Sequence, residues 1–153
     1  MVAVEKSPEA AAWLNKNIAK YDLPIRVVIE DVATALPDVK ADVVVANPPY
    51  IPNDEKLPIE VANFEPEMAL RGGPVDGMQI PKLFIDAATR LLKPGGLLII
   101  DQALSGGKVA DPTQRDPESI ARRDAIKVVK EDERWAASLI PIGAGVLVAN
   151  KLT

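Results

Sequence analysis

The pattern of apolar and polar positions divides the chain into short strands and longer helices. Apolar runs typical of buried strands lie at 2–5, 26–30, 41–46 and 97–100. Apolar residues at helical spacing predict helices at 8–20, 80–93 and 117–130. Two further apolar runs, at 136–142 and 145–150, meet at a turn that contains proline and glycine. Strands that alternate with helices predict an α/β fold with a mostly parallel sheet, and the last two strands predict a closing antiparallel hairpin.

The first predicted helix has a clear start. Ser7 is the expected N-cap, and Pro8 occupies the first helical position, where its missing N–H is harmless. Trp13, Leu14 and Ile18 follow at a spacing that places them on one face. We therefore expect this face to pack on the sheet.

Composition narrows the classes of function. The 153 residues predict one domain with a real core. The net charge is -4, so no general basic surface for nucleic acid is expected. Cysteine and histidine are both absent, which excludes disulfides, thiol chemistry and imidazole as a base or metal ligand, and we expect no metal site. No apolar run approaches membrane length and no signal peptide is visible, so a cytoplasmic protein without a membrane partner is predicted.

The most informative stretch is Asn47-Pro48-Pro49-Tyr50, directly after the apolar run at 41–46. The two prolines cannot donate to a ladder, and each restricts the residue before it, so the backbone here is stiff. The stretch follows the carboxyl end of a predicted parallel strand, which is where open α/β sheets place ligands. We therefore expect a rigid platform at the ligand-binding edge of the sheet.

This platform has the chemistry to hold a planar –NH2 group. The side-chain oxygen of Asn47 and the carbonyl of Pro48 are two acceptors, and the ring of Tyr50 can stack on the group that they hold. An amide nitrogen is a poor nucleophile because its lone pair is delocalised. Fixing both N–H bonds aims that lone pair at an incoming methyl carbon, which is catalysis by positioning and electrostatics. The alternative is a plain turn after a strand, which we would favour for an isolated Asn-Pro but not for the complete tetrapeptide.

The wider sequence resembles the PrmC/HemK family of methyltransferases. The resemblance rests on Asn47-Pro48-Pro49-Tyr50-Ile51-Pro52, on the stretch at 64–70 and on the glycine-rich stretch at 72–77. The resemblance extends from about residue 2 to residue 101 and continues weakly at 134–151. The residues between these two stretches resemble the family least. It implies a Rossmann-like class I fold, S-adenosylmethionine as the cofactor, and methylation of a glutamine side-chain amide in a peptide chain release factor.

The resemblance also implies roles for individual residues. The implied catalytic residues are Asn47, Pro48 and Tyr50; the substrate-binding residues are Asn47, Pro48, Pro49 and Tyr50; and the cofactor-binding residues are Glu5, Asp31, Val32 and Asn47. Glu5, at the tip of the first strand, would accept the two ribose hydroxyls, and Asp31 and Val32 would lie against the adenine. Read without the family, Glu5 is equally an exposed acid before a helix, and Asp31 an acid that caps a loop.

A long segment at 52–81 shows little periodicity and is expected to be irregular and to form the mouth of the substrate site. It is acidic, and its glycines, at 72, 73 and 77, are expected to supply bends or close approaches. The acidic residues are Asp54, Glu55, Glu60, Glu65, Glu67 and Asp76.

Two features of the resembling family are missing from this sequence. No strand and no glycine-rich turn precede the strand at 2–5, and the helical substrate-recognition domain is absent. We therefore expect residues 1–153 to be a partial catalytic domain that lacks the first strand and binds S-adenosylmethionine weakly or not at all. Strands left without a neighbour expose unpaired edges, so self-association through these edges is a further expectation.

Two other functions remain open. One is methylation of an exocyclic amine of adenine or guanine, although the acidic segment beside Asn47 argues against phosphate contacts there. The other is a catalytically silent domain that keeps the methyltransferase fold. We predict that release factor is the protein partner and that no nucleic acid is bound directly.

Overall fold

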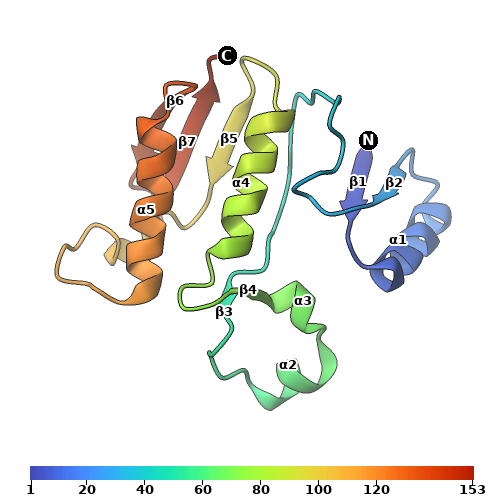
Figure 1. Ribbon diagram of the computed structural model, residues 1–153, viewed down its shortest axis with the longest axis horizontal. Helices are drawn as coiled ribbons and strands as arrows, with labels where there is room; N and C mark the ends of the chain where they lie inside the picture. Colours follow the sequence, from blue (N-terminus) through green and yellow to red (C-terminus); the bar gives the residue numbers. More distant parts are fainter. The chain divides into compact units, whose positions relative to one another are not determined.

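A computed structural model describes the backbone of all 153 residues and every side chain except those of Ser105 and Glu118. The chain forms two compact units, residues 1–39 and 40–153, which are drawn in Figure 1 and described separately here. The prediction of a single domain is not tested by this division. Among the described residues, no helix has the length and apolar character needed to cross a membrane.

The first unit is a strand–helix–strand motif. Strand β1 (Val2–Glu5) leads into α1 (Pro8–Lys20), and β2 (Arg26–Ile29) returns to pair with β1 in parallel. The hydroxyl of Ser7 accepts a hydrogen bond from the N–H of Ala10 at 3.2 Å, so the predicted N-cap is confirmed.

The predicted apolar face of α1 is only partly confirmed. Ala11 is fully buried, and Leu14 and Ile18 are half-buried. Trp13, however, is 66% exposed, and the ammonium of Lys16 lies 4.1 Å from its ring centroid. A pair of four-residue strands is too narrow to cover the whole face, so the largest side chain stays in solvent beneath a cation.

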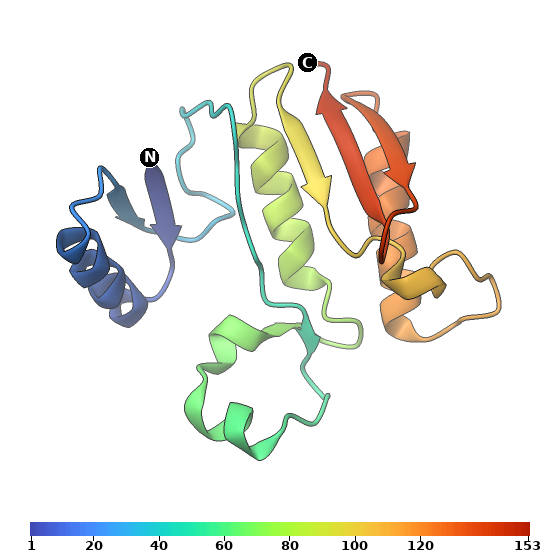
Figure 2. The same cartoon turned by 180° about the vertical axis from the view of Figure 1, so that it is seen from behind.

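The second unit is built on an antiparallel sheet with the order β5-β7-β6. Its strands are β5 (Leu97–Ile100), β6 (Trp135–Ile140) and β7 (Val146–Lys151), with Leu97 opposite Asn150 and Trp135 opposite Lys151. Helices α4 (Gln79–Leu91) and α5 (Pro117–Glu131) lie on the same face of this sheet (Figures 1 and 2). These elements confirm the predicted helices, the predicted strand at 97–100 and the closing hairpin.

The main hydrophobic core lies between this sheet and its two helices. Leu147 of β7 is fully buried, Leu92 is 1% exposed and Val129 of α5 is 2% exposed. The side chains of β5 alternate, so Leu98 faces the core while Leu97 and Ile99 remain more than half exposed on the other face. Each Å² of apolar surface removed from water contributes roughly 25 cal/mol to the free energy of unfolding. The buried face of the sheet is therefore expected to stabilise this unit most.

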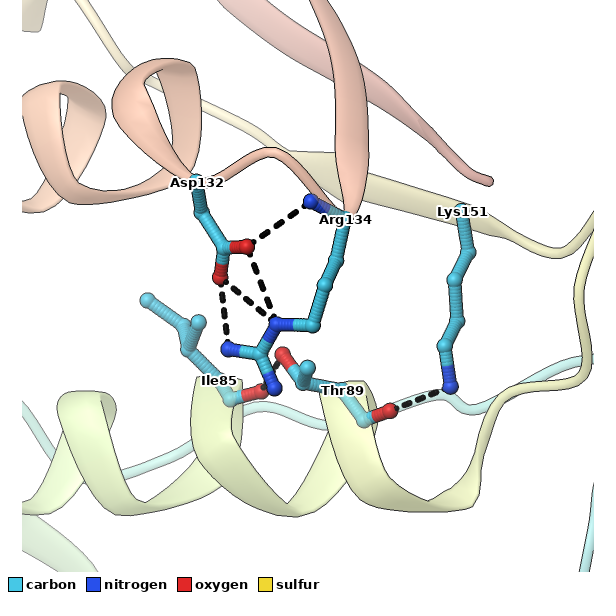
Figure 3. Close-up of polar contacts among 5 residues, drawn as sticks. All are labelled: Ile85, Thr89, Asp132, Arg134 and Lys151. Atoms are coloured by element: carbon cyan, nitrogen blue, oxygen red, sulfur yellow. Dashed lines mark hydrogen bonds and ion pairs between the residues drawn. The ribbon is translucent and has the colours of Figure 1, made fainter. Parts of the chain in front are cut away.

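A buried lysine fastens the end of β7 to the end of α4. Figure 3 shows Lys151, only 6% exposed, donating from Nζ to the carbonyl of Thr89 at 2.7 Å. A second bond of 2.7 Å reaches the carbonyl of Leu92. A cation here satisfies carbonyls at the helix C-terminus, which have no partner within the helix. Desolvation lowers the pKa of Lys151 below its usual value of 10.5.

The predicted strand at 41–46 is wrong. Ala41 makes one isolated parallel bridge with Leu92, and residues 42–50 then run on without regular secondary structure. Val43 and Val45 are 73% and 90% exposed, whereas Val44 packs against the core. A run of valines shows which side chains favour burial, but a strand also needs a neighbouring backbone to pair with.

The segment after this run is more ordered than predicted. Strand β3 (Ile51–Pro52) pairs in parallel with β4 (Arg71–Gly73), and α2 (Ile59–Phe64) and α3 (Glu67–Leu70) lie between them in sequence. These elements have two to six residues, which is too short for periodicity to reveal them. A short 3₁₀ turn, η1 (Ser105–Gly107), follows β5.

Candidate functional site

The predicted platform borders a hollow in the second unit. Asn47, Pro48 and Tyr50 line a crevice of about 350 Å³. Strand β5 and the residues after it, including Asp101 and Gln102, also line the crevice. The crevice thus reaches the carboxyl end of β5, where α/β folds place their ligands. Helices α4 and α5 contribute further lining residues, among them Phe84, Ile85, Arg122 and Ile126.

The acceptor groups of the platform are open. Asn47 is exposed, and no other described residue is hydrogen-bonded to its side chain. The carbonyl of Pro48 likewise makes no hydrogen bond to the described backbone. Tyr50 is 57% exposed and borders the same crevice. The three residues thus line one crevice, and their predicted roles toward a ligand stay predictions. Pro49 is half-buried behind them.

Sequence analysis missed three further polar residues that line the crevice, Asp101, Gln102 and Arg122. Asp101 and Gln102 follow β5 directly, and Nη1 of Arg122 in α5 donates to the carbonyl of Gln102 at 3.1 Å. The available signal was their position directly after the apolar run at 97–100. Asp101 is an acidic residue in a lining that is otherwise mainly apolar, and its Oδ1 accepts the N–H of Gln102 at 2.7 Å.

The cofactor residues predicted at 5, 31 and 32 lie together in the first unit. Strands β1 and β2 are parallel, so Glu5 and Asp31 are at the same edge of the pair. One oxygen of Glu5 accepts a hydrogen bond from the N–H of Ser7 at 2.8 Å. Val32 is half-buried beside Asp31. The cofactor-binding roles of these three residues stay predictions.

The carboxylate of Asp31 is engaged within the protein. Its Oδ2 forms an ion pair with Nζ of Lys6 at 2.7 Å, and its Oδ1 accepts the N–H of Ala33 at 2.9 Å. The hydrogen bond from Lys6, followed by that from Ala33, lowers the pKa of Asp31. These contacts are those of an acid that caps a loop, which was the alternative interpretation of this residue.

Comparison with known proteins gives two kinds of sequence match. A family model described as O-methyltransferase matches residues 79–152. Over 117 residues the chain is 38% identical to a release factor glutamine methyltransferase of Bifidobacterium longum, a match that covers 69% of this chain and 40% of that protein. Over 66 residues it is 41% identical to a protein of Mycobacterium avium whose provisional name is O-methyltransferase. This match covers 43% of the chain and 30% of that protein. The chain thus spans less than half the length of these curated relatives.

Solved structures show the fold. The O-methyltransferase TomG of Streptomyces achromogenes, solved in complex with S-adenosylmethionine, superposes with a TM-score of 0.55 at 16% identity, covering 99% of this chain and 61% of that one. The chain therefore has the fold of class I S-adenosylmethionine-dependent methyltransferases, which confirms the predicted fold class.

The family model says nothing of the platform. It begins at residue 79, so Asn47 to Tyr50 lie outside it. It does include residues 101–134, which resemble the PrmC/HemK family least. The resemblance is thus confirmed at the level of methyltransferases, while the glutamine-modifying identity is supported by the Bifidobacterium relative alone among these matches.

Proposed function

We propose that this chain carries the acceptor site of an S-adenosylmethionine-dependent N-methyltransferase that modifies a glutamine side-chain amide in a protein. The observation that carries this proposal is the pair of open acceptors, Asn47 and Pro48, beside Tyr50 at the crevice. A primary amide offers two N–H donors and a flat face, which match two acceptors and an aromatic ring.

The platform residues act on the acceptor nitrogen by holding it. The side-chain oxygen of Asn47 and the carbonyl of Pro48 each accept one N–H, so the lone pair of the nitrogen projects out of the amide plane. Tyr50 covers one face and leaves the other face for the methyl donor. Polar acceptors fixed before reaction stabilise the positive charge that develops on nitrogen without reorganising. After methylation the nitrogen is strongly acidic, so its proton can pass to water at the open side of the platform.

Other proteins of this fold bind S-adenosylmethionine, and some residues of the first unit have the chemistry to hold it. S-adenosylmethionine, when bound, supplies an electrophilic methyl group on a sulfonium. The carboxylate of Glu5 at the end of β1 is suited to accept ribose hydroxyls, and Val32 offers an apolar surface to the adenine. Asp31 is already occupied by Lys6 and Ala33, so in our proposal it orders the loop and leaves the adenine contact to Val32.

The partner follows from the same proposal. A glutamine in an exposed loop of a peptide chain release factor has the required amide, and the name of the Bifidobacterium relative supports this class of substrate. The segment after the platform carries acids at 54, 55, 60, 65, 67 and 76 against two basic residues, Lys56 and Arg71. This charge favours a basic protein surface over the phosphates of a nucleic acid.

A second candidate is methyl transfer to a hydroxyl. The O-methyltransferase model matches residues 79–152, and Asp101 within that range is an acidic residue of the crevice lining. A hydroxyl must lose its proton during attack, which a neighbouring carboxylate can assist. The amide needs no such base. The two candidate functions can therefore be distinguished by which acceptor, an amide or a hydroxyl, receives the methyl group.

The test is a methyl-transfer panel with isotope-labelled S-adenosylmethionine and the full chain at high concentration. The acceptors are a release-factor loop peptide, the same peptide with glutamate replacing glutamine, a catechol, and duplex DNA. We expect a low level of label, because cofactor binding is expected to be weak, and only on the glutamine peptide. Label on the catechol alone would replace our proposal by the second candidate, and label on DNA would favour amino-methylation of bases. No label on any acceptor, at a cofactor concentration that calorimetry shows to be saturating, would support a silent domain.

A further inference from the structure

The platform is held in place without the support of a sheet. Residues 42–50 form no ladder, and the only bridge on this segment is at Ala41, among the residues described. Rigid prolines fix the local shape of the platform, but they do not fix where it sits. Another part of the chain must therefore hold Tyr50 beside the crevice.

Two glycines pack directly against the backbone of Tyr50. A Cβ added to Gly72 would lie 2.6 Å from Cα of Tyr50 and would also collide with the carbonyl of Gly77. A Cβ added to Gly77 would lie 2.9 Å from the carbonyl carbon of Tyr50 and closer still to its oxygen. Gly77 also has a φ of +67°, a conformation that disfavours side chains. Both obstacles are backbone atoms, which cannot rotate away as a flexible side chain could.

Bonds on either side of these glycines anchor the segment that bears them. Ile51 pairs with Arg71 across β3 and β4, and the N–H of Asn53 donates to the carbonyl of Gly73 at 3.0 Å. Nη1 of Arg71 donates to the carbonyls of Pro52 at 2.7 Å and Glu55 at 2.9 Å. The chain immediately after the platform is therefore fastened at several points to residues 71–73.

Beyond Gly77 the same segment leads directly into the crevice wall. Oδ1 of Asp76 accepts the N–H of Met78 at 2.9 Å, which shapes the turn into α4. Met78 itself lines the crevice, as do Pro81 and Phe84 of α4. The segment 71–77 thus connects the backbone of Tyr50 with the helix that forms another wall of the same crevice.

We propose that residues 71–77 are a clamp that sets the position of the acceptor platform, with Gly72 and Gly77 as its positioning residues. The inference deepens the proposed function and rests on it for the identity of the amide. A side chain at either glycine displaces the backbone of Tyr50, and with it the carbonyl of Pro48 and the amide of Asn47, relative to the crevice. A displacement of about 1 Å is enough to lose most of the benefit of such positioning.

The experiment follows Tyr50 directly by nuclear magnetic resonance of the full chain with labelled tyrosine rings. The chain has two tyrosines, Tyr21 and Tyr50, so the spectrum holds one reporter and one internal reference. Gly77→Ala is compared with Gly143→Ala. Gly143 has a similar φ of +58°, but an added Cβ there meets no atom within 4 Å, so this control shares the backbone strain without the collision.

Each variant is then titrated with acetyl-glutamine-N-methylamide, whose only primary amide is the side chain, and with acetyl-glutamate-N-methylamide as the ligand control. We expect Gly77→Ala to shift the Tyr50 signal, leave Tyr21 unchanged, and weaken the response of Tyr50 to the glutamine probe roughly tenfold. Gly143→Ala should leave the Tyr50 signal and the titration unchanged. A Tyr50 signal and probe affinity in Gly77→Ala that equal those of the wild type would overturn the clamp.

The same data separate this inference from the proposed function. If Gly77→Ala shifts Tyr50 but the wild type does not respond to the glutamine probe, the clamp stands and the amide substrate fails. If Gly77→Ala does not fold, Arg71→Met replaces it, because methionine has no N–H to donate to the carbonyls of Pro52 and Glu55. Arg71→Met should shift Tyr50 in the same way, and an unchanged Tyr50 in a folded Arg71→Met chain would contradict the proposal.

Discussion

The sheet β5-β7-β6 and the segment 42–50 are both rich in apolar residues, but they are held by different forces. In the sheet, Leu98 and Leu147 are buried under two helices and every strand has a hydrogen-bonded neighbour. In the segment, Val43 and Val45 are exposed and no ladder forms. The sheet is stabilised by burial. Of the described residues in the segment, only Val44 packs against the core, and the end at Tyr50 is in close contact with Gly72 and Gly77.

This difference separates stability from function within one unit. The residues that bury the most apolar surface belong to the sheet, and those that offer open acceptors belong to the platform. Mutations in the two regions should therefore affect different measurements. Changes in the sheet should lower the free energy of unfolding, and changes in the platform should lower amide binding and methyl transfer. Each prediction below tests one side of this division.

The largest effect on stability is expected from Leu147→Ala. Leu147 is fully buried at the centre of the core, so truncation leaves a cavity and should cost about 2–5 kcal/mol of the free energy of unfolding. Leu97→Ala, on the exposed face of the neighbouring strand, is the matched control and should cost much less. Urea unfolding measures both, and equal costs would show that α4 and α5 do not cover the face assigned to them.

The largest effect on function is expected from Asn47→Ala. The variant loses one of two amide acceptors, which should cost about 2.7–4 kcal/mol of transition-state stabilisation for the glutamine acceptor. Because Asn47 is exposed, the free energy of unfolding should change by no more than about 0.5 kcal/mol. Near-normal methyl transfer to glutamine by the Asn47→Ala chain would remove the assignment.

A smaller effect separates the ring of Tyr50 from its hydroxyl. Tyr50→Phe keeps the stacking face and should bind the glutamine probe nearly as well as the wild type. Tyr50→Ala should lose about 0.5–1.5 kcal/mol of binding free energy. If titration shows Phe to be as damaging as Ala, the hydroxyl takes part in binding and the stacking account is wrong.

The smallest effect concerns the pH dependence of the sheet. Desolvation lowers the pKa of Lys151 below 10.5, so between its lowered folded value and 10.5 the unfolded chain binds more protons than the folded chain. The free energy of unfolding should therefore rise with pH across this window. Lys151→Met removes the titrating group, so the stability of the wild type relative to this variant should increase as the pH approaches 10.5. A decrease would mean that the bonds to Thr89 and Leu92 outweigh desolvation.

The sequence predicted well wherever burial alone decides the structure. The helices at 79–91 and 117–131 and the hairpin strands have periodic apolar faces, and the structure confirms them. The prediction failed at 41–46, because pairing depends on a neighbouring backbone that is not visible in local pattern. The platform at Asn47 to Tyr50 was predicted from its chemistry, and its role stays a prediction. Asp101 escaped notice because its place in the same crevice as the platform depends on tertiary structure.

The glycines illustrate what sequence can and cannot supply. Their close approach was expected from residue type, and the contacts of Gly72 and Gly77 confirm it. Their partner could not be foreseen, because Tyr50 lies more than twenty residues earlier and the elements between them are short. A glycine shows that space is needed, but only the structure shows which group occupies that space.

The most direct test of the platform is a nuclear Overhauser measurement between a ligand and Tyr50. Acetyl-glutamine-N-methylamide with a labelled side-chain nitrogen is added to the wild-type chain, and cross-peaks are recorded from its side-chain NH2 protons to the ring protons of the two tyrosines. We predict cross-peaks to Tyr50 and none to Tyr21, since only Tyr50 lies beside the open acceptors of Asn47 and Pro48. Absence of a cross-peak to Tyr50 at ligand saturation would contradict the claim that this site holds a primary amide.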